Sequence, residues 1–158
     1  MDTGGDAAER AANSALVREF GLLINAASRL EQRIDAALRV RCGIRHTMFE
    51  VLITLCRQPG EQVSQRELGA ELVLTSGGTT RLVDRMEQAG LVTRSPSATD
   101  RRVTVVSATE RGRTVFVGAT AVHAEVVAEF FVAPVAKRDY APLIRALTDI
   151  GDRSGTSP

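Results

Sequence analysis

Hydrophobic residues recur in steps of three and four toward both ends of the chain. Over residues 14–40 they occupy one face of a helix of about seven turns, a form suited to packing against another chain. These positions are Val17, Phe20, Ile24, Ala27, Leu30, Ile34 and Leu38. A second long stripe follows Thr109, the expected N-cap, and ends at Pro134; it consists of Val115, Ala119, Val122, Val126 and Phe130. A last helix is expected over residues 139–150, with Pro142 in its first turn.

Three shorter helices are expected between these two stripes. The first contains Phe49, Leu52, Ile53 and Leu55, begins after Gly43 and stops at Pro59-Gly60. The second opens at Ser64, where Ser64-Gln65-Arg66-Glu67 has the S-x-x-E pattern of a capping box, and buries Leu68 and Leu72. The third has Thr75 as N-cap, buries Leu82, Val83 and Met86, and ends at Gly90.

The hydrophobic period changes after Gly90. Residues 91–94 and 102–106 are rich in β-branched side chains, and residues 95–100 between them are typical of a turn, so a β-hairpin is expected. The order of short helix, tight turn, second helix and hairpin is that of a winged helix-turn-helix. The sequence therefore predicts a mainly α fold with a small β-hairpin wing. A single domain spans 14–151, with dimerisation helices at 14–42 and 109–150, the winged lobe at 45–108, and disordered tails at 1–13 and 152–158.

Composition narrows the possible functions. The chain has 158 residues, 44% hydrophobic and 25% charged, which suits one soluble globular domain. Aromatic residues make up only 4% and Trp is absent, which argues against a stacking platform for single-stranded nucleic acid. The net charge is only +1, so binding to duplex DNA requires positive charge concentrated on one face.

Several other classes find no support in the sequence. Residues 1–10 lack a signal-peptide core, and no apolar stretch approaches the roughly 18 residues of a membrane helix, so a cytoplasmic location is expected. Cys42 and Cys56 form no disulfide framework. His46 and His123 are distant in sequence and no cluster has the spacing of metal ligands, so neither a metal nor another cofactor is expected. No nucleophile, base and orienting group occur together, and hence no catalytic residues or enzyme activity are expected.

The second helix of the predicted helix-turn-helix has a first turn of small and hydroxyl-bearing residues. Gly77 and Gly78 each cost about 1 kcal/mol in a helix relative to Ala, which favours a close approach of the backbone to a partner such as DNA. Thr79 and Thr80 can donate to phosphate or meet a thymine methyl group, and Arg81 can bond to guanine with its two-pronged guanidinium. Arg85, one turn later, is expected to reach phosphate.

The hairpin adds further positive charge through three arginines. An arginine at the tip of a flexible loop can enter the narrow minor groove. Asp100 is a poor contact for DNA and is expected to orient a neighbouring arginine. The predicted DNA-contacting set of both elements is Thr75, Ser76, Gly78, Thr79, Thr80, Arg81, Arg85, Arg94, Asp100, Arg101 and Arg102.

These residues carry a resemblance to the MarR family of bacterial transcription regulators. The matching pattern consists of Glu67-Leu68-Gly69, Leu74-Thr75, the run RLVDRMEQAGLVTR at 81–94, DRR at 100–102 and VVSATERG at 105–112. Met86 replaces a usual leucine, and Ala108 stands where the family usually has leucine, which should loosen the junction between strand and helix.

The resemblance implies a homodimer that binds a pseudo-palindromic double-stranded operator and represses transcription. It also implies a cleft for a small aromatic or anionic effector that releases DNA; His46 and Phe49 lie in the corresponding region. Two alternatives remain: a dimerisation or antirepressor module of the same fold that does not bind DNA, and a regulator that senses oxidants through Cys42 or Cys56.

Overall fold

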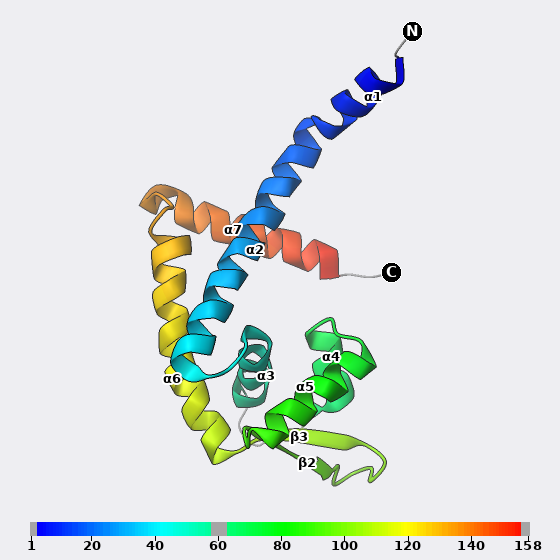
Figure 1. Cartoon of the computed structure of the whole chain (residues 1–158), viewed down its shortest axis with the longest axis vertical. Helices are drawn as coiled ribbons and strands as arrows, with labels where there is room; N and C mark the ends of the chain where they lie inside the picture. The colour runs from blue at the N-terminus through cyan, green and yellow to red at the C-terminus, as the bar shows by residue number, and fades with distance from the viewer. Residues whose placement is uncertain (1–2, 58–62, 156–158) are drawn as a thin grey trace. The chain divides into compact units, whose positions relative to one another are not determined.

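The computed structural model describes residues 3–57 and 63–155, which form two compact units. The terminal unit comprises residues 1–32 and 124–158, and the central unit comprises residues 33–123. Both unit boundaries fall inside long helices, because α2 (Ala15–Cys42) and α6 (Glu110–Val127) each contribute to both units (Figure 1). The central unit is therefore longer than the winged lobe expected at 45–108, because it includes the adjoining ends of α2 and α6.

The terminal unit is entirely helical within the described residues. It contains α1 (Thr3–Ala12), residues 15–32 of α2, the end of α6, a π-helical turn (Ala128–Val132) and α7 (Lys137–Gly155). The expected disordered tail at 1–13 is wrong over α1, where an alanine-rich segment has high helix propensity. The expected tail at 152–158 is wrong as far as Gly155. The remaining tail residues, 1–2 and 156–158, lie outside the described part of the chain.

Helix α7 begins two residues earlier than the sequence indicated. Its start at Lys137 places Pro142 beyond the first turn, where proline was not expected. The missing N–H of Pro142 removes one hydrogen bond from the helix, yet the helix continues.

Helix α6 and the π-helical turn together form a long apolar segment. Glu110–Val132 is long and apolar enough, by length and composition alone, to cross a membrane, and it is the one such helix among the described residues. Residues 110–132 contain no long uninterrupted apolar run, because Thr, Gly and His lie among the Val and Ala residues.

The central unit combines three short helices with an antiparallel sheet. Its remaining elements are α3 (His46–Arg57), β1 (Val63–Ser64), α4 (Gln65–Glu71), α5 (Ser76–Gln88), β2 (Val92–Pro96) and β3 (Thr104–Ala108). The strand order is β1-β3-β2, and Val106 of β3 pairs with both Val63 and Arg94. The hairpin of β2 and β3 is confirmed, whereas the two-residue strand β1 was not expected. The expected stop of α3 at Pro59-Gly60 lies outside the described residues.

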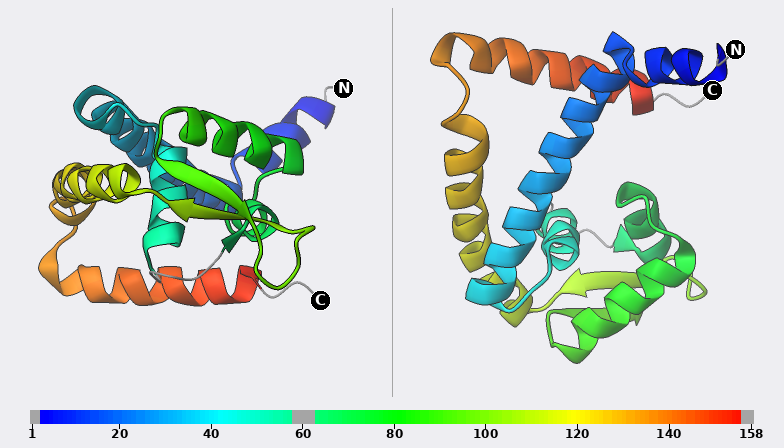
Figure 2. Two further views of the ribbon diagram at one scale, coloured as in Figure 1. Left: turned by 90° about the horizontal axis from the view of Figure 1, so that it is seen from below. Right: turned by 45° about the horizontal axis from the view of Figure 1, so that its top comes forward.

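Polar caps define the helix ends of the central unit as expected. In the capping box, the Ser64 N–H donates to the Glu67 carboxylate at 2.7 Å, and the Glu67 N–H donates to the Ser64 hydroxyl at 3.2 Å. The Thr75 hydroxyl accepts from the Gly78 N–H at 3.1 Å, so Thr75 caps α5. Figure 2 shows the hairpin beside α5, with the loop between its strands projecting from the unit.

The core of the central unit lies between its helices and the sheet. Its fully buried side chains come from every layer: Leu38, Val51, Leu52, Leu68, Val83, Met86, Val92 and Val106. Gly112 permits the closest approach in this region, because an added Cβ would lie 2.0 Å from the carbonyl oxygen of Leu91. The packing therefore fixes the start of α6 against the residue that precedes β2.

Candidate nucleic-acid interface

Helix α5 presents one polar face to solvent and buries the other. Leu82, Val83 and Met86 are buried, as expected. The exposed face carries Ser76, Thr80, Arg81 and Arg85. This face therefore offers hydroxyl groups near the helix start and two guanidinium groups one turn apart.

Thr79 does not belong to the exposed face, and its predicted contact with DNA is wrong. Its side chain is only 2% exposed and its hydroxyl donates to the Thr75 carbonyl oxygen at 3.0 Å. It packs against Gly69 of α4, where an added Cβ would lie 2.7 Å from the Thr79 hydroxyl oxygen. Thr79 thus sets the close contact between α4 and α5 rather than meeting a ligand.

The other small residues at the start of α5 also have internal partners. The Thr80 hydroxyl donates to the Ser76 carbonyl oxygen at 3.0 Å and accepts from the Gln65 side chain at 2.7 Å. Its hydroxyl group is therefore already bonded within the chain. Gly78 leaves room for the capping hydroxyl of Thr75, which an added Cβ would approach to 3.1 Å, whereas Gly77 faces open space.

Arg94, at the middle of β2, is bound by carboxylates of α5 and does not extend toward solvent. Its guanidinium lies 2.6 Å from Asp84 and 2.9 Å from Glu87, and it donates to the Thr80 carbonyl oxygen at 3.3 Å. The side chain is 22% exposed. This arginine joins the hairpin to α5, which leaves its guanidinium few free donors, and its contact with DNA stays a prediction.

The wing loop is held by its own hydrogen bonds. The Val103 N–H donates to the Asp100 carbonyl oxygen at 2.9 Å, and the Ser97 N–H donates to the Val103 carbonyl oxygen at 2.8 Å. The Asp100 carboxylate accepts from the N–H of Arg102 at 3.0 Å and from its Nε at 3.3 Å. Asp100 thus orients an arginine, as expected, while Arg101 and Arg102 remain exposed.

His46 and Phe49 belong to an aromatic cluster that the sequence analysis did not foresee. The ring centroid of Phe49 lies 6.5 Å from that of His46, 5.0 Å from that of His123 and 5.6 Å from that of Phe116. Phe49 is 2% exposed and forms part of the core, and its role as a ligand contact stays a prediction. His46 is half-buried, and its role stays a prediction.

Helix α6 brings together residues that are distant in sequence. The rings of His46 and His123 are 6.3 Å apart, and burial, together with the nearby His46, lowers the pKa of His123.

Asp35 of α2 lies beside the start of α3. Partial burial of Asp35 acts to raise its pKa, but hydrogen bonds from the His46 backbone and from Arg45 hold that pKa below the usual range. Among the described residues, no group of three or more His, Cys, Asp or Glu side chains gathers to hold a metal ion.

Both cysteines are free thiols and both are partly buried. Burial raises the pKa of the Cys56 thiol, although Arg113 acts in the opposite direction. A reactive, oxidant-sensing cysteine requires a lowered pKa, so the environment of Cys56 disfavours that role.

The helix-turn-helix of α4 and α5, followed by a hairpin with an arginine-rich loop, defines a winged helix-turn-helix protein. The model of the MarR family matches residues 43–103 of this chain, which cover the winged helix-turn-helix. The regulator MhqR of Bacillus subtilis is 43% identical over 70 residues, which cover 44% of this chain and 47% of that relative. The chain spans about half the length of the first relatives that it matches by sequence.

Solved structures extend the match over the whole fold. Sco3205 of Streptomyces coelicolor, a MarR family regulator in complex with DNA, has a TM-score of 0.81 at 21% identity and shows the shared fold. That match covers 91% of this chain and 94% of Sco3205. CouR of Rhodococcus jostii RHA1, bound to p-coumaroyl-CoA, has a TM-score of 0.73 at 29% identity, covering 87% of this chain and 95% of CouR.

Proposed function

We propose that this chain is a sequence-specific, DNA-binding transcriptional regulator that acts as a homodimeric repressor. One observation carries the proposal. The polar face of α5 and the arginines of the wing are both exposed, and both belong to the central unit. Arg81 and Arg85 extend from α5, and Arg101 and Arg102 extend from the wing loop. A helix of this kind suits the major groove, and loop arginines suit the minor groove.

The DNA-contacting set that we propose is smaller than the one the sequence indicated. It consists of Ser76, Thr80, Arg81, Arg85, Arg101 and Arg102, with Thr75, Gly78 and Asp100 as supports of the backbone and side-chain geometry. Sequence relatives named as transcriptional regulators and the DNA-bound structure of Sco3205 support this assignment.

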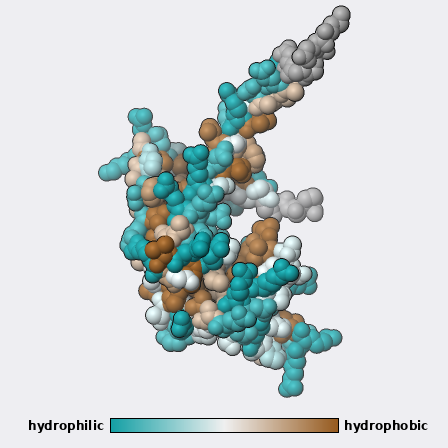
Figure 3. Space-filling view, viewed as in Figure 1, coloured by the Kyte–Doolittle hydropathy of each residue, from teal (hydrophilic) through white to brown (hydrophobic). Residues whose placement is uncertain are grey.

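Exposed apolar residues in the terminal unit support a homodimer. Val17 is 57% exposed, Phe20 64% and Ile24 49%, and Figure 3 shows hydrophobic surface on this part of α2. Such residues at successive turns of one helix form a patch that soluble monomers rarely leave open. A two-fold dimer presents two copies of α5 to the half-sites of a pseudo-palindrome. Sedimentation of a well-folded monomer at micromolar concentration would contradict the dimer.

We further propose release of DNA by a small aromatic or anionic effector near His46. The structure of CouR with p-coumaroyl-CoA supports an effector of this chemistry. Effector and DNA would then weaken each other's binding through reciprocal linkage. A ligand screen that moves neither the melting temperature nor the DNA affinity would count against this part.

We also propose that the protein has no enzyme activity and a cytoplasmic location, in line with a regulator of transcription.

Selection of bound sequences from random duplex DNA tests the central proposal. We expect enrichment of an inverted repeat, followed by a gel shift on the selected duplex. The charge-removing variant Arg81→Ala should lose most of that shift while it keeps the same unfolding transition. Failure to enrich any sequence, by a folded dimer, would favour the alternative of a dimerisation or antirepressor module.

A further inference from the structure

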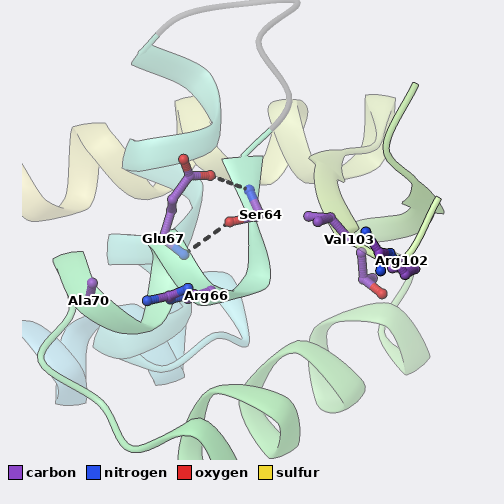
Figure 4. A pocket seen from close by; sticks show the side chains of 7 residues that line it. Ser64, Arg66, Glu67, Ala70, Arg102 and Val103 are labelled. Atoms are coloured by element: carbon purple, nitrogen blue, oxygen red, sulfur yellow. Dashed lines mark hydrogen bonds between the residues drawn. The ribbon is translucent and has the colours of Figure 1, made fainter. Parts of the chain in front are cut away.

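A groove lies between the start of α4 and the end of the wing loop. It has a volume of about 570 Å³, and its polar lining includes Ser64 and Arg66 on one side and Arg102 and Thr104 on the other (Figure 4). The short side chain of Ala70 keeps the groove open on the helix side. Two guanidinium groups and two hydroxyl groups thus border one open space.

Arg66 also borders a second groove, of about 310 Å³, at the start of α5. Gln65, Ser76 and Thr80 line that groove together with Arg66. The exposed side chain of Arg66 therefore lies between α5 and the wing. Among the residues that the structure describes, the Arg66 side chain makes no hydrogen bond or ion pair, so its guanidinium is available to a ligand.

The single carboxylate of the groove is committed to the protein itself. Glu67 accepts the Ser64 N–H at 2.7 Å, and hydrogen bonds from Ser64 hold the pKa of Glu67 below its usual range. Figure 4 shows the Glu67 side chain turned back to Ser64, while Arg102 and Val103 enter from the wing. The groove keeps a net positive charge, and Asp100 restrains one of its two arginines.

Duplex geometry indicates what occupies this position. A sugar–phosphate strand separates the major groove from the adjacent minor groove. If α5 enters the major groove and the wing enters the minor groove, that strand must pass between them, where Arg66 lies. Arginine binds phosphate oxygens with two parallel N–H donors.

We infer that the groove between α4 and the wing binds a phosphodiester of the DNA backbone, with Arg66 as its principal ligand. This inference rests on the proposed function and adds to the interface a residue outside the predicted DNA-contacting set. The contact fixes the position of the protein on the duplex and carries no sequence information.

The test compares Arg66→Gln with the wild-type full-length chain on the selected operator across a salt series. Each lost phosphate contact should make the slope of log K against log salt shallower by about 0.9 per protomer. Affinity should fall roughly tenfold, as expected for one hydrogen-bonded charge contact. Arg153→Gln, which removes an exposed arginine from the last turn of α7, outside the expected dimerisation helices, is the matched control and should behave as the wild type.

Ethylation interference separates a contact from a structural effect. In the wild type, ethylation of one phosphate between the major-groove and minor-groove contacts of each half-site should block binding. That interference should vanish in Arg66→Gln, while interference at the other phosphates persists. Arg66→Lys keeps the charge and should retain most of the salt slope, which serves as a second variant if the Gln variant folds poorly.

Unchanged slope, affinity and interference pattern in Arg66→Gln would overturn the inference while leaving DNA binding intact. A wild-type protein that selects no DNA sequence would instead refute the proposed function. The two failures are therefore distinguishable.

Discussion

The guanidinium of Arg94 lies 2.6 Å from the carboxylate of Asp84, which joins the first strand of the wing to the recognition helix. The Glu87 carboxylate lies 2.9 Å from the same guanidinium and accepts the backbone N–H of Arg94 at 3.1 Å. We call this set of contacts the Arg94 clamp. One arginine thus neutralises part of the charge of two carboxylates on α5. The clamp fixes where the hairpin stands relative to the helix that we propose reads DNA.

Removal of this clamp should weaken both stability and DNA binding. We expect Arg94→Met to lower the free energy of unfolding by about 1 kcal/mol, because two carboxylates of α5 that are 41% and 45% exposed lose their partner. DNA affinity should fall severalfold because those carboxylates then repel phosphate. Denaturant unfolding and gel shifts measure the two effects.

A triple variant separates charge from geometry in the Arg94 clamp. Adding Asp84→Asn and Glu87→Gln to Arg94→Met removes the repulsion without restoring the clamp. We expect DNA affinity to recover more than stability does. Equal loss of affinity in the single and triple variants would mean that only the geometry of the clamp matters.

The exposed arginine at the wing tip should act on DNA and not on folding. We expect Arg101→Ala to lower affinity by on the order of 1–3 kcal/mol and to make the salt slope shallower by about one unit per protomer. Stability should change by less than about 0.5 kcal/mol, because the residue is an exposed loop residue. Operator binding across a salt series and unfolding by denaturant test this. A large stability loss would show that Arg101 is structural.

The contact between Gly69 and Thr79 should prove structural. We expect Gly69→Ala to destabilise the protein by about 1–3 kcal/mol, because the new Cβ would lie 2.7 Å from the Thr79 hydroxyl oxygen. Combining it with Thr79→Ala removes that oxygen and should cost less than the sum of the two single changes. A double-mutant cycle in urea measures the coupling; strict additivity would contradict the close contact.

Stability should fall as the pH drops below neutrality, because the pKa of His123 is lowered from its usual value of 6.5. The unfolded chain then binds more protons than the folded chain, so protonation favours unfolding. The slope contributed by one group cannot exceed about 1.4 kcal/mol per pH unit. Urea unfolding between pH 5.5 and 7.5 should show this slope in the wild type and a flatter profile in His123→Gln. A profile unchanged by the substitution would assign the dependence to other groups.

The sequence by itself determined the local elements of this protein. Ser64 and Glu67 form the capping box, Thr75 caps α5, and Leu82, Val83 and Met86 are buried, because caps and hydrophobic periods depend on neighbours within a few residues. The same local patterns identified the α5 and wing segments that carry the proposed interface.

Only the tertiary structure decided which polar residues are free to bind a partner. Thr79 and Thr80 are adjacent in sequence, yet packing against Gly69 buries one and leaves the other exposed. Arg94 and Arg102 both belong to the hairpin, but Asp84 and Glu87 hold the first while the second stays open to solvent. His123 reaches the ring of His46 through the path of α6. Such pairings depend on contacts between distant segments, which no local period or spacing encodes.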